Sequence, residues 1–164
     1  MSPKESLKEK KLLDSFSETV TYIPEKYSET EIDTTMSNGF RVFIKTYTDM
    51  ESSVLNEVKQ DTIIHKNYFR NSKINIEIAK NGKLLFNENF EKDFFIKKYP
   101  DNNKSLENSV LQLVWLDDNR YNENKVYIKI AFCIPDSEIC FDYDLTVNGD
   151  GSYSIKETDK AKTI

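Results

Sequence analysis

The chain has 164 residues, of which 38% are hydrophobic and 12% aromatic, so it is long enough for one domain with a sizeable core and short for two. Its formal net charge of −5 at pH 7 repels phosphate backbones, and no cluster of basic and aromatic side chains offsets this repulsion, which argues against nucleic-acid binding. No long apolar run occurs, so we expect no membrane-spanning segment.

Residues 1–28 are expected to form a charged, flexible tether and lead-in, residues 29–158 a single β-domain, and residues 159–164 a C-terminal tail. The opening residues, MSPKESLKEKKLL, lack the apolar run of a signal peptide. Two interpretations are open. The protein is cytosolic with a loose amino terminus, or it is an exported product whose leader has been replaced by Met-Ser.

Three stretches have the alternation of apolar residues and the turn residues that are typical of β-hairpins. In TTMSNGFRVFI, a two-residue loop would put apolar residues opposite polar ones, whereas a three-residue loop aligns the apolar residues on one face. All three stretches have a glycine at the third loop position, where a bulge requires a left-handed conformation. The expected pairs are Ile32–Ile44 and Thr34–Val42 around loop 37–39, Ile76–Phe86 and Ile78–Leu84 around loop 80–82, and Leu145–Ile155 and Val147–Tyr153 around loop 149–151.

Further elements are expected between and after these hairpins. They are strands at 62–69 and 109–116, a short helix within 90–99, and a hairpin of 126–133 with 140–147. The helix would use Phe94, Phe95 and Ile96 to cap one end of a core, and pairing Phe132 with Phe141 gives the hairpin one apolar face. The total of about eight or nine strands predicts a mainly β fold, either an antiparallel sandwich or a partly open barrel.

These registers bring one set of apolar side chains together as the expected core. It comprises Ile32, Val42, Ile44, Ile76, Ile78, Leu84, Phe86, Ile128, Ile130, Phe132, Phe141 and Leu145. The polar residues that alternate with them along each strand are expected to face solvent.

Cys133 and Cys140 are the only cysteines, and the register of the last long hairpin places them directly opposite each other. Opposed Cβ atoms in an antiparallel pair lie about 4.5 to 5.5 Å apart, close to what a disulfide tolerates. We favour a disulfide that staples the hairpin; two structural free thiols and a reactive thiol site are the alternatives. An oxidised pair would indicate export.

Other chemistry is weakly supported. His65 is the only histidine, so a zinc site lacks ligands, and no nucleophile accompanies it in a recognisable motif. The stretch TVNGDGSYSIKE resembles part of a calcium loop through Asn148, Asp150 and Glu157, but it lacks the first acidic ligand and a hairpin turn explains it. We therefore expect no catalytic residue, cofactor or metal site.

Trp115 and the nine tyrosines offer another kind of site, because flat rings stack on sugars. A concave strip of aromatic side chains that contained Trp115 would indicate a carbohydrate-binding groove. Core or rim positions for these rings are the alternative. Asp142 and Asp144 share one strand face, but this spacing occurs on any polar sheet face and does not by itself indicate an acid/base pair.

The run TTMSNGFRVFIKTYTDMESSVL, followed by KINIEIAKNGKLLFN, resembles an uncharacterised domain-of-unknown-function family of small lipoproteins from Bacteroidota. The similar span covers residues 30–157. The resemblance implies a cell-envelope location, in the periplasm or outer membrane, and a signal peptide ending in a lipidated cysteine, which this chain does not carry. It supplies no catalytic residues, since these are turn and strand motifs.

Three hypotheses about function follow. The first, which we favour, is a non-catalytic envelope β-domain that binds or scaffolds another protein through an exposed edge strand or sheet face. The second is a carbohydrate- or small-ligand-binding module. The third is an enzyme of unfamiliar design, which would require a cleft that gathers His65 with two or more acids. Under each hypothesis, we expect the protein to associate with the membrane only through a lipid anchor.

Overall fold

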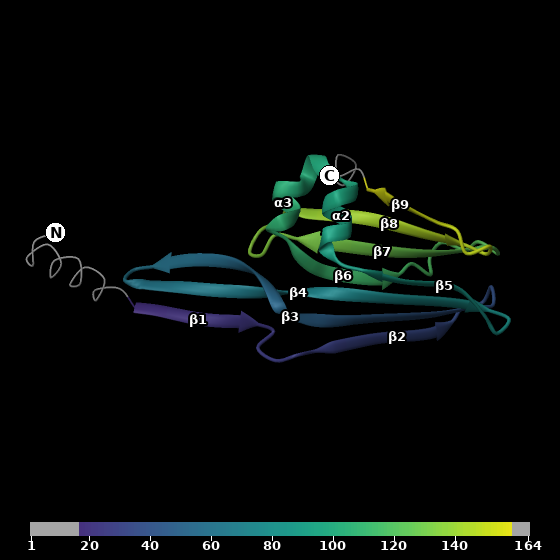
Figure 1. Cartoon of the computed structure of the whole chain (residues 1–164), viewed down its shortest axis with the longest axis horizontal. Helices are drawn as coiled ribbons and strands as arrows, with labels where there is room; N and C mark the ends of the chain where they lie inside the picture. Colours follow the sequence, from purple (N-terminus) through teal and green to yellow (C-terminus); the bar gives the residue numbers. More distant parts are fainter. Residues whose placement is uncertain (1–16, 159–164) are drawn as a thin grey trace, which may run out of the picture.

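The computed structural model describes residues 17–158, which form two β-sheets and two short α-helices (Figure 1). The larger sheet contains β1 (Ser17–Ile23), β2 (Glu29–Thr35), β3 (Phe40–Gln60), β4 (Ile63–Lys80) and β5 (Lys83–Phe90). The smaller sheet contains β6 (Val110–Leu116), β7 (Lys125–Cys133), β8 (Cys140–Asn148) and β9 (Tyr153–Glu157). The helices are α2 (Lys92–Lys98) and α3 (Asn103–Glu107), joined by the 3₁₀ turn η1 (Pro100–Asn102). The prediction of a mainly β fold is confirmed, and the described strands do not close into a barrel.

The larger sheet is built around one long hairpin. β3 pairs antiparallel with β4, and β2 extends the sheet beside residues 41–47 of β3. Two strands share the other edge of β4, because β1 runs parallel to residues 63–69 and β5 antiparallel to residues 74–80. The β1–β4 pair makes this sheet mixed, whereas the sequence predicted only antiparallel pairing. The smaller sheet is an antiparallel meander in the order β6-β7-β8-β9.

Apolar side chains from both sheets, from α2 and from Leu106 of α3 form one core. Ten of the twelve predicted core residues are buried: Val42, Ile44, Ile76, Ile78, Phe86, Ile128, Ile130, Phe132, Phe141 and Leu145. Ile32 is half-buried and packs against this core, but Leu84 is 54% exposed and its predicted burial is wrong. Each fully buried large apolar side chain contributes about 1.5–3 kcal/mol relative to an exposed one.

Leu84 is exposed because the β4–β5 turn is shorter than predicted. Lys80 pairs with Lys83 across a two-residue loop, whose Asn81 and Gly82 have φ values of 54° and 75°. This is the conformation that Asn-Gly favours in tight hairpins. A bulge after Ile78 then pairs that residue with Phe86, so the predicted Ile78–Leu84 and Ile76–Phe86 pairs do not form.

The other predicted registers are confirmed. The observed pairs include Ile32–Ile44, Thr34–Val42, Leu145–Ile155, Val147–Tyr153, Phe132–Phe141 and Cys133–Cys140. Gly39 and Gly151 take left-handed conformations at the third positions of their loops, with φ of 89° and 88°. A side chain at Gly151 would also collide with the backbone, because an added Cβ would lie 2.6 Å from the carbonyl oxygen of Leu85.

The amino-terminal part of the described chain differs from the prediction. Residues 17–23, expected within a flexible lead-in, form β1 of the larger sheet. The rest of the proposed tether (1–16) and the proposed tail (159–164) lie outside the described residues. The predicted helix is α2, in which Phe95 is fully buried, whereas α3 was not expected.

One part of the larger sheet extends past the smaller sheet (Figure 1). We call it the β-arm; it consists of β1, residues 53–60 of β3 and residues 63–70 of β4. A pairing irregularity between Thr48 and Ser53 separates the β-arm from the part of the sheet that covers the core. The predicted strand at 62–69 is therefore the outer half of an 18-residue strand.

Candidate binding surface

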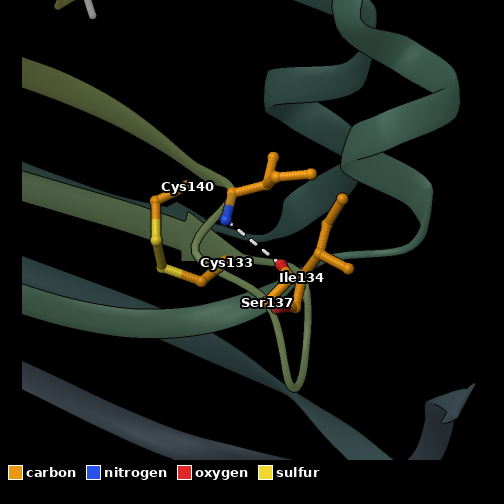
Figure 2. The surroundings of a disulfide bond; sticks show 5 residues. Cys133, Ile134, Ser137 and Cys140 are labelled. Carbon is orange, nitrogen blue, oxygen red and sulfur yellow. Dashed lines mark hydrogen bonds between the residues drawn. A yellow bond between two sulfur atoms is a disulfide. The ribbon is translucent and has the colours of Figure 1, made fainter.

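Cys133 and Cys140 form a disulfide across the ends of β7 and β8, so the predicted staple is confirmed (Figure 2). The turn between them is also held by hydrogen bonds. The amide of Ile134 donates to the carbonyl oxygen of Ile139 at 2.9 Å, and Ser137 Oγ donates to the carbonyl oxygen of Ile134 at 2.8 Å. The bond leaves no free thiol in this turn, and it fits an extracytoplasmic protein.

The disulfide turn contacts the base of the β-arm. Asn56 Nδ2 in β3 donates a hydrogen bond of 2.6 Å to Asp136 Oδ2 at the tip of the turn. Phe69 of β4, Val110 of β6 and the disulfide line a pocket of about 380 Å³ where the β-arm leaves the sandwich. These contacts position the β-arm relative to the smaller sheet.

Exposed apolar side chains are concentrated on the β-arm and its base. Among the described residues, fourteen large hydrophobic side chains are exposed, and seven of them belong to this region. These seven are Val20, Tyr22, Ile23, Met50, Leu55, Val58 and Ile63. Single exposed apolar residues are common, whereas such a concentration makes this region a candidate interaction surface.

The β-arm has one face on which aromatic and aliphatic side chains form a row across its three strands. We call it the tyrosine face. The strand register places Leu55 opposite Tyr68 and Tyr68 opposite Tyr22. The two tyrosine rings stack with centroids 5.0 Å apart, and the Arg70 guanidinium lies 4.4 Å from the Tyr22 centroid. These contacts fix the orientation of the two rings.

A charged row follows this apolar row towards the tip. Glu57 lies opposite Lys66, and Lys66 lies opposite Val20. Lys66 Nζ is 3.3 Å from Glu18 Oε1, and this ion pair raises the pKa of Lys66. The tyrosine face therefore has an apolar centre with charged groups at its rim, as interfaces between soluble proteins commonly do.

Two edges of the β-arm are unpaired in the described part of the chain. No described strand lies beside residues 53–60 of β3, since β2 ends beside residue 47, and none lies on the outer side of β1. Such edges present backbone donors and acceptors to an incoming strand. The sequence analysis missed β1, although SETVTYI has the β-branched and aromatic alternation of a strand.

His65 lies on the opposite face of the β-arm, away from any acidic cluster. Its Nδ1 is 2.7 Å from Thr19 Oγ1, and its other cross-strand neighbour is Val58. Within residues 17–158, no group of three or more His, Cys, Asp or Glu side chains is arranged to hold a metal ion. No helix in this range is long and apolar enough to cross a membrane.

Trp115 does not belong to an aromatic row on the smaller sheet. It is 39% exposed on the outer face, where its cross-strand neighbour is Lys129, followed by Asp144 on the next strand. The nearby ring of Tyr127 is covered by the Arg120 guanidinium at 4.3 Å. The concave aromatic strip that would indicate a carbohydrate groove is therefore not formed around Trp115.

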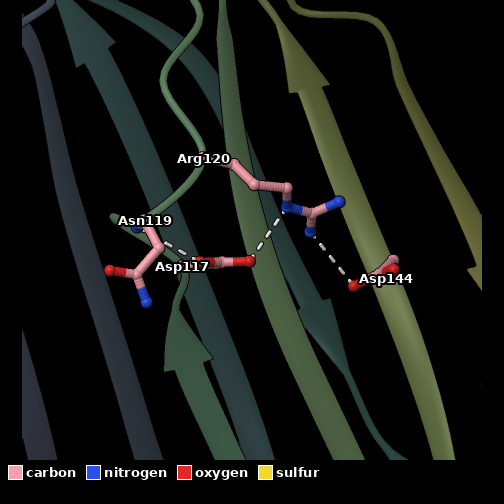
Figure 3. Close-up of polar contacts among 4 residues, drawn as sticks. All are labelled: Asp117, Asn119, Arg120 and Asp144. Atoms are coloured by element: carbon pink, nitrogen blue, oxygen red, sulfur yellow. Dashed lines mark hydrogen bonds and ion pairs between the residues drawn. The ribbon is translucent and has the colours of Figure 1, made fainter.

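The acidic residues of the smaller sheet act in local structure. Arg120 Nε donates to buried Asp117 Oδ2 at 2.9 Å, and its Nη2 donates to Asp144 Oδ1 at 3.2 Å (Figure 3). Asp117 Oδ1 also accepts a hydrogen bond from the amide of Asn119. These bonds fix the loop after β6 and hold Asp144 in an ion pair with Arg120.

The stretch that resembles a calcium loop is closed by its own hydrogen bonds. Asp150 Oδ1 accepts hydrogen bonds from Ser152 Oγ at 2.5 Å and from the Ser152 amide at 2.9 Å, and both lower the pKa of Asp150. Asn148 Nδ2 donates to Ser152 Oγ at 3.0 Å. Glu157 lies on β9 opposite Tyr143, at the far end of the strand from the loop. The side chains are thus arranged as a hairpin turn.

Two further polar groups, on half-buried Lys92 and buried Tyr143, lie outside the β-arm. Lys92 Nζ donates to the carbonyl oxygens of Glu107 and Ser109 at 3.0 and 2.9 Å, which ties α2 to the segment after α3. Burial lowers the pKa of Lys92. Burial also raises the pKa of Tyr143, whose hydroxyl has no hydrogen-bond partner. Neither group opens onto the β-arm.

The comparison with protein families assigns most of the chain to one family. Residues 8–155 match the family described as domain of unknown function DUF4738. No curated protein matches the sequence significantly. Because the match covers most of the chain, including all strands except the last two residues of β9, the protein belongs to the DUF4738 family.

Proposed function

We propose that this protein is a non-catalytic β-domain of the cell envelope that binds another protein through the β-arm. The observation that carries the proposal is the concentration of exposed apolar side chains on a three-stranded projection outside the sandwich. Exposing these side chains is unfavourable in an isolated protein, because apolar surface is stabilised by removal from water. A partner that covers the β-arm would remove that cost.

The tyrosine face has the chemistry of a protein-binding hot spot. Tyr22 and Tyr68 are stacked, and Leu55 continues the row. Tyrosines lose little conformational freedom on binding and present a large contact area, and for this reason they are enriched where interfaces are strongest. The open edge of β1 adds main-chain groups that an extended segment of a partner can pair with.

The proposed location is the periplasm or outer membrane, with a lipid anchor on the precursor. The disulfide supports a location outside the cytoplasm. The resemblance of the hairpin motifs to Bacteroidota lipoproteins supports the anchor. Incorporation of a labelled fatty acid into the protein in its native cells is the expected result, and recovery of unlabelled protein from the cytosol would overturn this part of the proposal.

The absence of catalysis is also part of the proposal. His65 and the acids of the smaller sheet lie on different sheets, and Asp117 and Asp144 are held by Arg120. A glycan-binding role is not favoured by any observation, because Trp115 has charged cross-strand neighbours.

Photo-crosslinking in the native cells tests the proposal. A photoreactive amino acid replaces Leu55 on the tyrosine face or, as the matched control, Leu84 on β5; the two side chains are 46% and 54% exposed. We expect the Leu55 position, and not the Leu84 position, to give a crosslink to one protein of different mass from this chain. Mass spectrometry identifies that protein.

Equal crosslinking from both positions, or no crosslink from Leu55, would overturn the assignment of the β-arm as the binding surface. The control is informative because both residues are exposed leucines in strands of the larger sheet. The comparison therefore distinguishes a crosslink that depends on the β-arm from non-specific association with exposed apolar residues.

A further inference from the structure

We propose that two copies of the chain also pair with each other, antiparallel, along residues 56–60 of β3. The two β-arms would then form one continuous six-stranded sheet. This inference concerns the free edge of β3 and does not rest on the proposed partner at the tyrosine face. The residues whose substitution should change the pairing, Glu57, Val58 and Lys59, differ from the residue whose substitution tests the proposed function, Leu55.

The edge of β3 is suited to strand addition. β3 continues well past the last residue that β2 pairs with, and in the described chain its outer half has a neighbouring strand only on the β4 side. Alternate backbone groups along that half therefore face outward. Neither proline nor glycine occurs in residues 53–60, so the edge lacks the residues that most directly prevent pairing.

The charge pattern of the edge is self-complementary in one register. In a sheet that continues through a two-fold axis, side chains on one face of the first copy meet side chains on the same face of the second. Odd-numbered residues of β3 therefore pair with odd-numbered residues of the second copy, and even-numbered residues with even-numbered ones. A register centred on Val58 places Glu57 of each copy opposite Lys59 of the other. The same register pairs Asn56 with Gln60 and places the two Val58 side chains together.

The neighbouring registers are less favourable. Centring the axis on Glu57 would place the two Glu57 carboxylates opposite each other, and like charges in directly opposed positions are destabilising. Centring it on Asn56 would place Glu57 opposite Leu55 and Lys59 opposite Ser53, with no ion pair. The register centred on Val58 is therefore the one that the sequence of this edge selects.

The shape of the molecule permits this arrangement. The β-arm projects beyond the smaller sheet, and an antiparallel partner strand would carry the sandwich of the second copy past the opposite end of the overlap (Figure 1). The pairing stops at Asn56, where the disulfide turn contacts β3 through Asp136. The two sandwiches therefore lie at opposite ends of the shared sheet and do not collide.

The register also extends the charged row of the tyrosine face. Lys66 lies opposite Glu57 within one copy, so Glu57 would stand between Lys66 of its own chain and Lys59 of the second copy. The two-fold axis generates the same charged row a second time, in the other half of the dimer. Because the overlap is short, we expect a dimer that dissociates on dilution, with exchange measurable between about 10 μM and about 1 mM.

Sedimentation velocity on the full chain, with charge-swap variants, tests the register. Glu57→Lys and Lys59→Glu each convert two attractive pairs into two repulsive pairs, so each should weaken association by about tenfold or more. The double variant Glu57→Lys with Lys59→Glu restores opposite charges in both pairs and should recover most of the association. Glu88→Lys, an equal charge change on an exposed residue of β5, should leave association unchanged.

A second measurement covers the case in which a charge variant disturbs the β-arm itself. In the proposed dimer Val58→Cys places two thiols at the symmetry axis, so mild oxidation should give a disulfide-linked dimer. Leu55→Cys on the same strand lies away from the axis and should give little. A monomer at every concentration, association indifferent to the single swaps, a double variant that does not recover, or equal crosslinking of the two cysteine variants would overturn the proposal.

Discussion

Replacing both cysteines by serine is expected to destabilise the protein without unfolding it. The disulfide joins residues seven positions apart, so it closes a short loop. The loop-closure relation for such a length gives about 2.4 kcal/mol of stabilisation through the unfolded chain. The cost of losing it is limited, because the Ile134–Ile139 hydrogen bond still closes the turn and the buried Phe132–Phe141 pair holds the strands together.

For a chain of this length, about 2.4 kcal/mol corresponds to a decrease in Tm of roughly 5–10 °C. Differential scanning calorimetry of the oxidised protein, the reduced protein and the Cys133→Ser, Cys140→Ser variant measures it. The reduced protein and the variant should agree with each other. A variant that does not fold, or a Tm that does not change, would refute the view that the disulfide is a local staple of an already determined hairpin. Partner binding through the tyrosine face should remain, since the disulfide lies outside that face.

Two pairs of substitutions make further predictions that thermal or urea unfolding can check. Gly151→Ala should lower the free energy of unfolding by about 1–3 kcal/mol more than Gly82→Ala does. Both glycines have positive φ, but only the added Cβ at Gly151 would meet the backbone of Leu85. Equal losses of stability in the two variants would contradict this close approach. Tyr143→Phe should leave stability unchanged or raise it by about 1 kcal/mol, because the buried Tyr143 hydroxyl has no hydrogen-bond partner. Tyr99→Phe removes a 3.0 Å hydrogen bond to a carbonyl oxygen of β9 and should lower stability by about 1 kcal/mol. A loss at Tyr143 equal to that at Tyr99 would show that its hydroxyl is satisfied.

The hairpins were predictable from the sequence because a one-residue slip would move every apolar side chain to the wrong face. The same constraint places Cys133 directly opposite Cys140, where the disulfide forms. The prediction from apolar alternation failed at Leu84, because the preference of Asn81-Gly82 for a two-residue turn sets the register there. A bulge then restores the apolar alignment at Phe86. Alternation alone does not reveal such a bulge.

The β-arm was not predictable by the same reasoning. Its strands bury few side chains fully, so residues 53–60 and 63–70 contain polar and apolar residues without a regular alternation. β1 pairs with β4 in parallel across about forty residues of sequence, and short-range turn rules do not detect a pairing of that kind. The region that matters most for the proposed function is thus the one where burial gives the weakest signal.

The most direct test of the central claim is the affinity of the crosslinked partner, once purified, for variants of the β-arm. Isothermal titration calorimetry compares the wild-type chain with Leu55→Asp on the tyrosine face and Leu84→Asp on β5. A charge placed in the apolar row should weaken binding by about tenfold or more, because truncating or charging a hot-spot residue costs more than about 1.4 kcal/mol. Leu84→Asp should bind as the wild type does. Equal affinities for all three proteins would contradict the claim that the β-arm is the binding surface.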